Sequence, residues 1–145
     1  MPRKQQPARQ QSMADVLDAD IGALDLTPVH LVLALSQGWS TARIRRAELD
    51  YRLFLQLVRN EPRCPQVPSL AGDQFWHAHL QCTAHYVETC QRIFGQLLCH
   101  YPFAGALGAQ DARRQRHRYQ ESQAKLAEMR GAYRSRTTLQ QPQRR

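Results

Sequence analysis

The chain has 145 residues, of which 42% are hydrophobic, and its formal net charge at pH 7 is +8. This length predicts a single domain, and no segment has the pattern of a signal peptide or approaches the length of a membrane span. Four cysteines without such a signal or a CxxC pair make a disulfide framework and a zinc ribbon unexpected. We therefore expect a cytoplasmic protein with free thiols and no membrane contact.

The positive charge is concentrated at the two ends of the chain. Residues 1–11 carry +3, residues 111–145 carry +7 from nine Arg and one Lys against three acids, and residues 12–110 carry −2. Arg-rich ends can make weak, non-specific contacts with nucleic acids. The plainer interpretation is a solubilising terminus, and the scarcity of aromatic residues among the arginines argues against a platform for stacking single-stranded bases.

The first predicted helix follows a basic N-terminal segment. Residues 1–14 are rich in Gln, Arg and Pro without hydrophobic periodicity, so we predict that they are disordered. A helix is predicted over 28–37, because Thr27 is a good N-cap, Pro28 suits the first turn and Gly38 suits the position after the end. Its apolar residues lie on nearly every side, which predicts burial all round.

Two further helices are predicted in the middle of the chain. One begins after Ser40 and reaches about Arg59, with apolar residues at three- and four-residue spacing on one face. A proline-rich loop then leads to Ser69, the expected N-cap of a helix from Leu70 to Leu98. Gly95 is a weak point in this third helix.

The C-terminal part of the chain is predicted as a basic helix over 111–133, after a loop that contains Pro and Gly. Its apolar stripe is thin, so we expect it to dock loosely on a helical core domain over 15–110. Residues 134–145 are predicted to be disordered. With no convincing strand pattern, the fold class is all-α: a small domain of about four helices with disordered basic termini.

The stretch over 73–102 contains four of the six histidines and three of the four cysteines. Its HxH pair is ambiguous, because residues two apart on a regular helix point about 200° away from each other. His77 and His79 therefore cannot bind one metal ion unless the helix is distorted. Asp73 and His77 are four apart, so they are neighbours that can form a carboxylate–imidazole pair.

Three interpretations of this stretch remain open. In the first, His79 is a hydrogen-bonded core residue, His77 is a surface residue, and Tyr86 and Cys90 only pack. In the second, a distortion near Trp76 brings both histidines to one site. In the third, only His79 of the HxH pair belongs to the site, where Cys90 or the loop after the helix joins it. About 16 Å of straight helix would separate His79 from Cys90.

The candidate metal ligands are two histidines of the helix and one of the following loop, with a carboxylate and a thiol nearby: His77, His79 and His100, with Asp73 and Cys99. His100 can join only if the chain bends back on itself. Zinc is the divalent metal that best suits imidazole, thiolate and carboxylate ligands. No HEXXH, P-loop or GxSxG motif is present, so the residues leave open whether the protein is an enzyme.

The spacing of these residues resembles a known family. The pattern Trp76-His77-x-His79, Tyr86, Cys90, Phe94-Gly95 and His100-x-Pro102 is similar to the glycine-rich domain-containing protein-like family, over about residues 21–110. The opening Leu24–Pro28, the pair Gly38-Trp39, the segment Tyr51-Arg52-x-Phe54-Leu55 and the pair Val67-Pro68 extend the similarity. The resemblance implies that Asp73 and these motif residues form one site, but it implies no reaction, because the family has no assigned activity.

Two features depart from the family pattern. Relatives have a His-His pair where this chain has Cys99-His100, and the Arg-rich C-terminal segment is longer than is usual. Cysteine still binds soft or borderline metals, so a site could survive with altered preference. Three functional hypotheses follow: a His-centred metal-binding protein, a protein-interaction module without metal, and an accessory protein that contacts nucleic acid through its basic ends.

Overall fold

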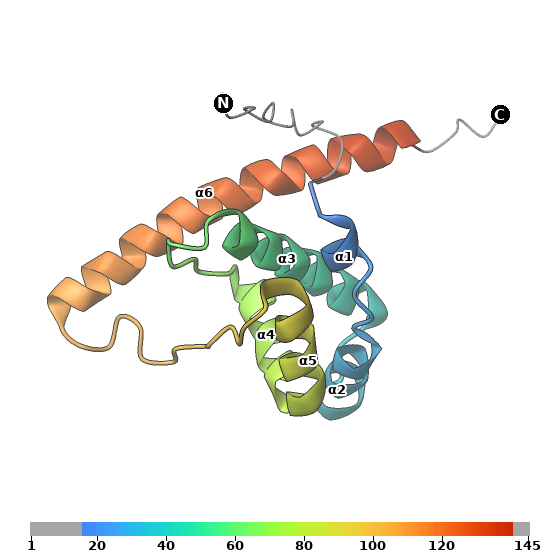
Figure 1. Ribbon diagram of the computed structural model, residues 1–145, viewed down its shortest axis with the longest axis horizontal. Helices are drawn as coiled ribbons and strands as arrows, with labels where there is room; N and C mark the ends of the chain where they lie inside the picture. Colours follow the sequence, from blue (N-terminus) through green and yellow to red (C-terminus); the bar gives the residue numbers. More distant parts are fainter. Residues whose placement is uncertain (1–15, 141–145) are drawn as a thin grey trace, which may run out of the picture.

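The computed structural model describes residues 16–140, which are arranged in helices and loops without strands (Figure 1). The predicted all-α class is confirmed, whereas the prediction for residues 1–14 lies outside the described residues. The elements in chain order are α1 (Ala19–Gly22), α2 (Thr27–Gln37), α3 (Thr41–Asn60), α4 (Leu70–Gln81), α5 (Thr83–Phe94) and α6 (Ala109–Gln140).

Helix α3 lies at the centre of the fold and packs against α1, α2, α4 and α6. It begins as predicted, because the Ser40 hydroxyl accepts a hydrogen bond from the backbone N–H of Arg43 at 3.3 Å. Its Tyr51 and Phe54 side chains are buried against α4, where Phe54 packs on Trp76 with ring centroids 5.0 Å apart. The aromatic contacts of α3 therefore both form part of the core and fix the position of α4.

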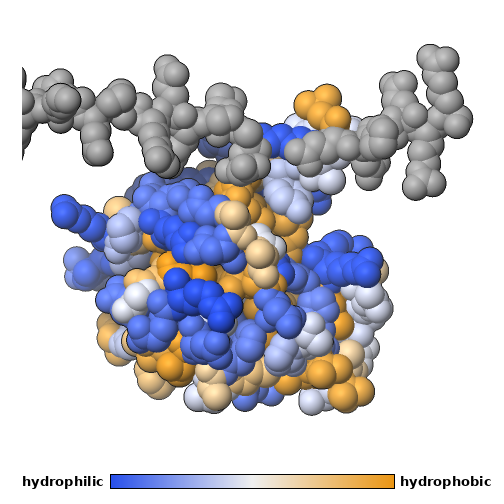
Figure 2. All heavy atoms as spheres, turned by 45° about the vertical axis from the view of Figure 1, so that its right-hand side comes forward, coloured by the Kyte–Doolittle hydropathy of each residue, from blue (hydrophilic) through white to orange (hydrophobic). Residues whose placement is uncertain are grey.

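Helix α2 is not buried all round, which corrects the sequence-based prediction. Val29 and Leu33 lie in the core, but Leu31 is 54% exposed and Leu35 is 82% exposed. Apolar residues are visible at several places among polar ones on the face shown in Figure 2. Only one face of α2 contacts the neighbouring helices α3 and α4, so a uniformly apolar composition overestimated its burial.

The stretch Ala19–Gln37 is long and apolar enough, by length and composition, to cross a membrane, and it is the only such stretch among residues 16–140. We expected none. In the structure it consists of the separate helices α1 and α2, and Ile21, Val29 and Leu33 are fully buried in the core. A core helix passes the same test of length and composition, and the burial of these three side chains accounts for part of the apolar character, while Leu31 and Leu35 are exposed.

The single helix predicted from Leu70 to Leu98 is two helices. At Cys82, with φ −89° and ψ 60°, the chain leaves the helical conformation between α4 and α5. The hydroxyl of Thr83 donates a hydrogen bond to the carbonyl of Leu80 at 3.1 Å, a local bond that competes with helix continuation. Gly95, the expected weak point, ends α5 with φ +70°, a left-handed conformation that favours glycine.

The break at Cys82 makes α4 and α5 a helical hairpin. The two helices lie side by side in Figure 1 and contact each other. The hairpin returns the chain to the start of α4, where His100 lies beside Asp73 and His77. This reversal is the bend on which the sequence-based metal site depended.

Helix α6 packs more firmly and extends further than predicted. Leu126 and Ser122 are both 1% exposed, and ion pairs join Lys125 to Glu61 and Arg130 to Asp50. In Figure 1 the helix lies across α3 and extends beyond it in both directions. It begins at Ala109 and ends at Gln140, so residues 134–140, predicted to be disordered, are helical, while 141–145 lie outside the described residues.

Replacing Ser122 by alanine is expected to lower the free energy of unfolding by about 1–3 kcal/mol. Its hydroxyl accepts from the backbone N–H of Val67 and donates to the side chain of Gln66, both at 2.9 Å. Alanine would leave both partners unpaired in a buried contact. Urea denaturation measures the effect, and Ser135→Ala is the matched control, because the exposed Ser135 hydroxyl bonds only within α6. Equal stability of the two variants would contradict the docking described here.

Candidate metal centre

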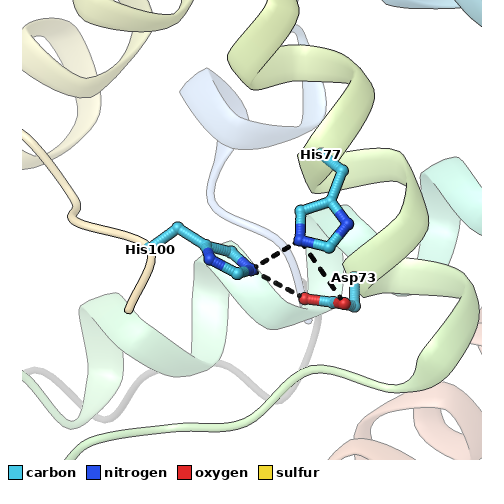
Figure 3. A group of neighbouring side chains, drawn as sticks. All are labelled: Asp73, His77 and His100. Atoms are coloured by element: carbon cyan, nitrogen blue, oxygen red, sulfur yellow. Dashed lines mark hydrogen bonds and ion pairs between the residues drawn. The ribbon is translucent and has the colours of Figure 1, made fainter. Parts of the chain in front are cut away.

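Three side chains converge where the segment after α5 meets the first turns of α4 (Figure 3). Asp73 and His77 lie one turn apart on α4, and His100 approaches from the returning segment. The Nε2 atoms of His77 and His100 are 2.9 Å apart, and Asp73 Oδ1 lies 3.1 Å from His100 Nε2. The potential ligand atoms all lie within 4.8 Å of one another, so this group could hold a metal ion.

The separations in this cluster suit a small divalent ion. Metal–ligand bonds of 2.0–2.1 Å at tetrahedral angles place two ligand atoms about 3.3 Å apart, close to the 2.9 and 3.1 Å observed. The second oxygen of Asp73 lies 3.7 Å from His77 Nε2. The three groups therefore lie close enough together to hold one ion.

Trp76 and Tyr86 hold the returning segment against α4. The indole N–H of Trp76 donates to the hydroxyl of Tyr86 at 3.0 Å, and that hydroxyl donates to the carbonyl of Leu98. The ring of Trp76 also packs edge-on against His100, with centroids 4.6 Å apart. Burial raises the pKa of Tyr86 well above its usual value, so this hydroxyl keeps its proton and remains a donor.

His79 lies outside the cluster, although the sequence analysis included it among the candidate ligands. Its side chain is fully buried, with Nδ1 2.7 Å from the Tyr51 hydroxyl and Nε2 2.8 Å from His85 Nδ1. Burial, with repulsion from His85, lowers the pKa of His79 to about 4. The HxH pair therefore diverges as regular helical geometry requires: His77 faces His100, and His79 is a core residue.

His85 is a polar partner that the sequence analysis missed. It follows the break at Cys82, and only the α4–α5 hairpin places it within 2.8 Å of His79. In a continuous helix the two residues, six apart, would point in different directions. The signal that could have revealed this pair is the break itself, which no glycine or proline marks.

The cysteines contribute less than the sequence suggested. All four are free, as expected. Cys90 is 1% exposed and belongs to the hydrophobic core, so it packs and does not join the cluster. Cys99 is exposed beside His100 but is not one of the three clustered residues. Asp73, expected beside the three candidate histidines, is one of the three clustered residues.

The cluster forms part of the wall of a cleft of about 990 Å³. The cleft is bounded by the loop over 61–68, the segment over 98–104 and the first half of α6. The side chain of His77 is 50% exposed, that of Asp73 33% and that of His100 17%. A metal ion bound here would keep coordination positions open to the cleft.

Comparisons with known proteins give no information about this site. No protein-family model matches the chain, and no curated protein or solved structure matches it. The resemblance to the glycine-rich domain-containing protein-like family therefore stays an expectation from the motif residues.

Proposed function

We propose that this protein binds one divalent metal ion, zinc, through Asp73, His77 and His100. The proposal is carried by one observation, the convergence of a carboxylate and two imidazoles within 4.8 Å at the edge of a cleft. Two histidines and a carboxylate are a common ligand set for zinc, and also for iron(II). Contacts from Trp76 and Tyr86 support it, because partners that orient the ligands accompany functional metal sites.

The ligand set also indicates what the ion would do. Three protein ligands with open positions are typical of catalytic zinc sites, whereas structural sites have four protein ligands. Such an ion polarises carbonyl or phosphoryl oxygens and lowers the pKa of bound water to about 7. We extend the proposal to a cytoplasmic location, supported by the four free cysteines, and to membership of the glycine-rich domain-containing protein-like family, supported by the motif residues around the cluster.

Elemental analysis tests the proposal directly. Protein purified without a His-tag is expected to contain about one zinc per chain, or to take up one after chelation and reconstitution. Stoichiometric iron with little zinc would keep the site and change the metal. No stoichiometric metal before or after reconstitution would refute metal binding and favour the alternative, a protein-interaction module that binds a partner at the face around His77 without metal.

Replacing Tyr86 by phenylalanine is expected to weaken zinc binding roughly tenfold while the fold is retained. The change removes the hydroxyl that links Trp76 to the Leu98 carbonyl, so the segment that carries His100 loses an anchor. Competition with a chromogenic chelator measures the affinity, and circular dichroism checks the helix content. Tyr133→Phe is the matched control, because Tyr133 lies on α6 and does not line the cleft. Unchanged affinity in Tyr86→Phe would show that the hydroxyl does not position His100.

The basic N-terminal end of α6 favours a second candidate function, weak binding of nucleic acid. Arg113, Arg114 and Arg116 are exposed and have no ion-pair partner among residues 16–140. Cations near a helix N-terminus oppose the helix dipole, so local stability does not explain their presence. Replacing all three by glutamine should reduce the slope of the logarithm of the duplex-binding constant against the logarithm of the salt concentration. The reduction should correspond to the loss of about two to three phosphate contacts. An unchanged salt slope would exclude this segment as the contact.

A further inference from the structure

The cleft beside Asp73, His77 and His100 contains unpaired positive charge, and the geometry points to a small organic anion as its ligand, with a carboxylate or phosphate head group. The inference rests on the proposed metal ion and goes beyond it by naming the class of molecule bound. It follows from the charges that line the cleft and from the apolar side chains beside them.

The charged side chains that line the cleft are two arginines and two acids, and among residues 16–140 only the acids have close partners. Arg63 and Arg118 line it, and neither has an ion-pair partner within the described part of the chain. Three arginines of the folded body that join elements of the structure do have such partners: Arg52, Arg59 and Arg130 each contact a carboxylate. The two cleft arginines do not take part in ion pairs of this kind.

The acids that line the cleft are already engaged. Among the described lining residues they are Glu61 and Asp73. Glu61 is neutralised by Lys125 at 2.6 Å and also accepts from Gln66 at 2.9 Å, while Asp73 faces the two histidines. A divalent ion bound at Asp73 would leave the ion and this carboxylate together with a net charge of +1. Such a cleft attracts anions, and guanidinium groups bind carboxylate and phosphate oxygens in a bidentate manner.

The remaining walls indicate an organic rather than an inorganic anion. Apolar and aromatic side chains line the cleft between the metal cluster and α6: Phe54, Val58, Trp76, Leu98 and Tyr119. Its volume of about 990 Å³ falls in the range of small-molecule sites, and such sites combine apolar walls with a few polar groups that fix the ligand. The head group would occupy the open metal positions and bond to Arg63 or Arg118, and the apolar body would lie against these walls.

Anion titrations of the cobalt(II)-substituted protein test the inference, because the visible absorption of cobalt(II) responds to a change in its ligands. The probes are benzoate and phenylphosphonate, with benzamide as the uncharged analogue of benzoate. Both anions are expected to change the spectrum with saturation, and benzamide is not. The relative affinity of the two anions distinguishes a carboxylate from a phosphate head group.

The same titrations of Arg118→Gln and Arg63→Gln separate the arginines from the metal. At least one variant is expected to bind the anions roughly tenfold more weakly, which corresponds to about 1.4 kcal/mol, with unchanged cobalt affinity. Arg113→Gln is the matched control, since Arg113 is exposed on α6 and does not line the cleft. Wild-type affinity in both variants, or a cobalt spectrum that neither anion changes, would overturn the anion site alone. Failure of the wild-type protein to bind cobalt would overturn the metal site with it.

Discussion

Replacing His100 by alanine is expected to weaken zinc binding by roughly 100-fold or more, because one of three protein ligands is lost and partners beyond the ligands already contribute 10–100-fold. His77→Ala should have an effect of the same order, since its Nε2 lies 2.9 Å from that of His100. Asp73→Asn keeps the shape of the side chain but removes its charge, and we expect a smaller loss. Chelator competition and thermal unfolding with added zinc measure these effects.

The control for these variants is His117→Ala. His117 is a solvent-exposed histidine of α6, whose side chain is 72% exposed, and it does not belong to the cluster. Its replacement should leave the affinity unchanged, and zinc at 100 times its dissociation constant should still stabilise that variant by about 2.7 kcal/mol. An equal loss of affinity in His117→Ala and His100→Ala would show that zinc binds histidines non-specifically.

The structural variant His79→Gln separates the two roles of the HxH pair. His79 contacts Tyr51 and His85 and does not face His100. In a variant that remains folded, the zinc affinity should therefore stay within a few-fold of the wild-type value. A loss as large as that of His77→Ala would place His79 in the site and contradict the division observed here.

Local sequence signals predicted the beginnings of α3 and α4 and the end of α2, but Thr27, the expected N-cap of α2, is the first residue of that helix, which has no side-chain cap. Ser40 and Ser69 both accept a hydrogen bond from a backbone N–H in the first turn that follows, and Gly38 ends α2 with φ +65°. These features depend on residues within one turn of one another. The break at Cys82 depends on a side-chain bond from Thr83 and on the packing of α5 against α4, and a hydrophobic pattern that continues across it conceals it.

The candidate site was predictable only in part for the same reason. Helical spacing alone paired Asp73 with His77 and separated His77 from His79. The arrival of His100 requires the hairpin and the anchor that Tyr86 provides at the Leu98 carbonyl, both of which are contacts between elements. The docking of α6 was underestimated because it depends, besides the apolar stripe, on the hydrogen bonds of Ser122 and the ion pairs of Lys125 and Arg130, which an apolar pattern does not reveal.

Acidification of the metal-free protein is expected to reduce its free energy of unfolding between about pH 6.5 and pH 4, by roughly 3 kcal/mol from His79 alone. The folded protein holds the pKa of His79 at about 4, whereas the unfolded chain has the ordinary value near 6.5. Between these values the unfolded state binds more protons than the folded state, so stability falls as the pH falls. Urea denaturation in the presence of a chelator, at steps between pH 7 and pH 4.5, measures the slope.

The comparison with His79→Gln assigns this slope to one group. The variant should be less stable than the wild type at pH 7, because it weakens the contacts with Tyr51 and His85, but its stability should fall less steeply with acid. His117→Gln should follow the wild type. Asp20, whose pKa is lowered by its bond to Arg59, loses its contribution to stability at pH values below the range in which His79 acts.

Burial is the largest cause of the lowered pKa of His79 and repulsion from His85 is the second, so His85→Gln should retain most of the slope. A wild-type slope in His79→Gln would mean that another group drives acid unfolding.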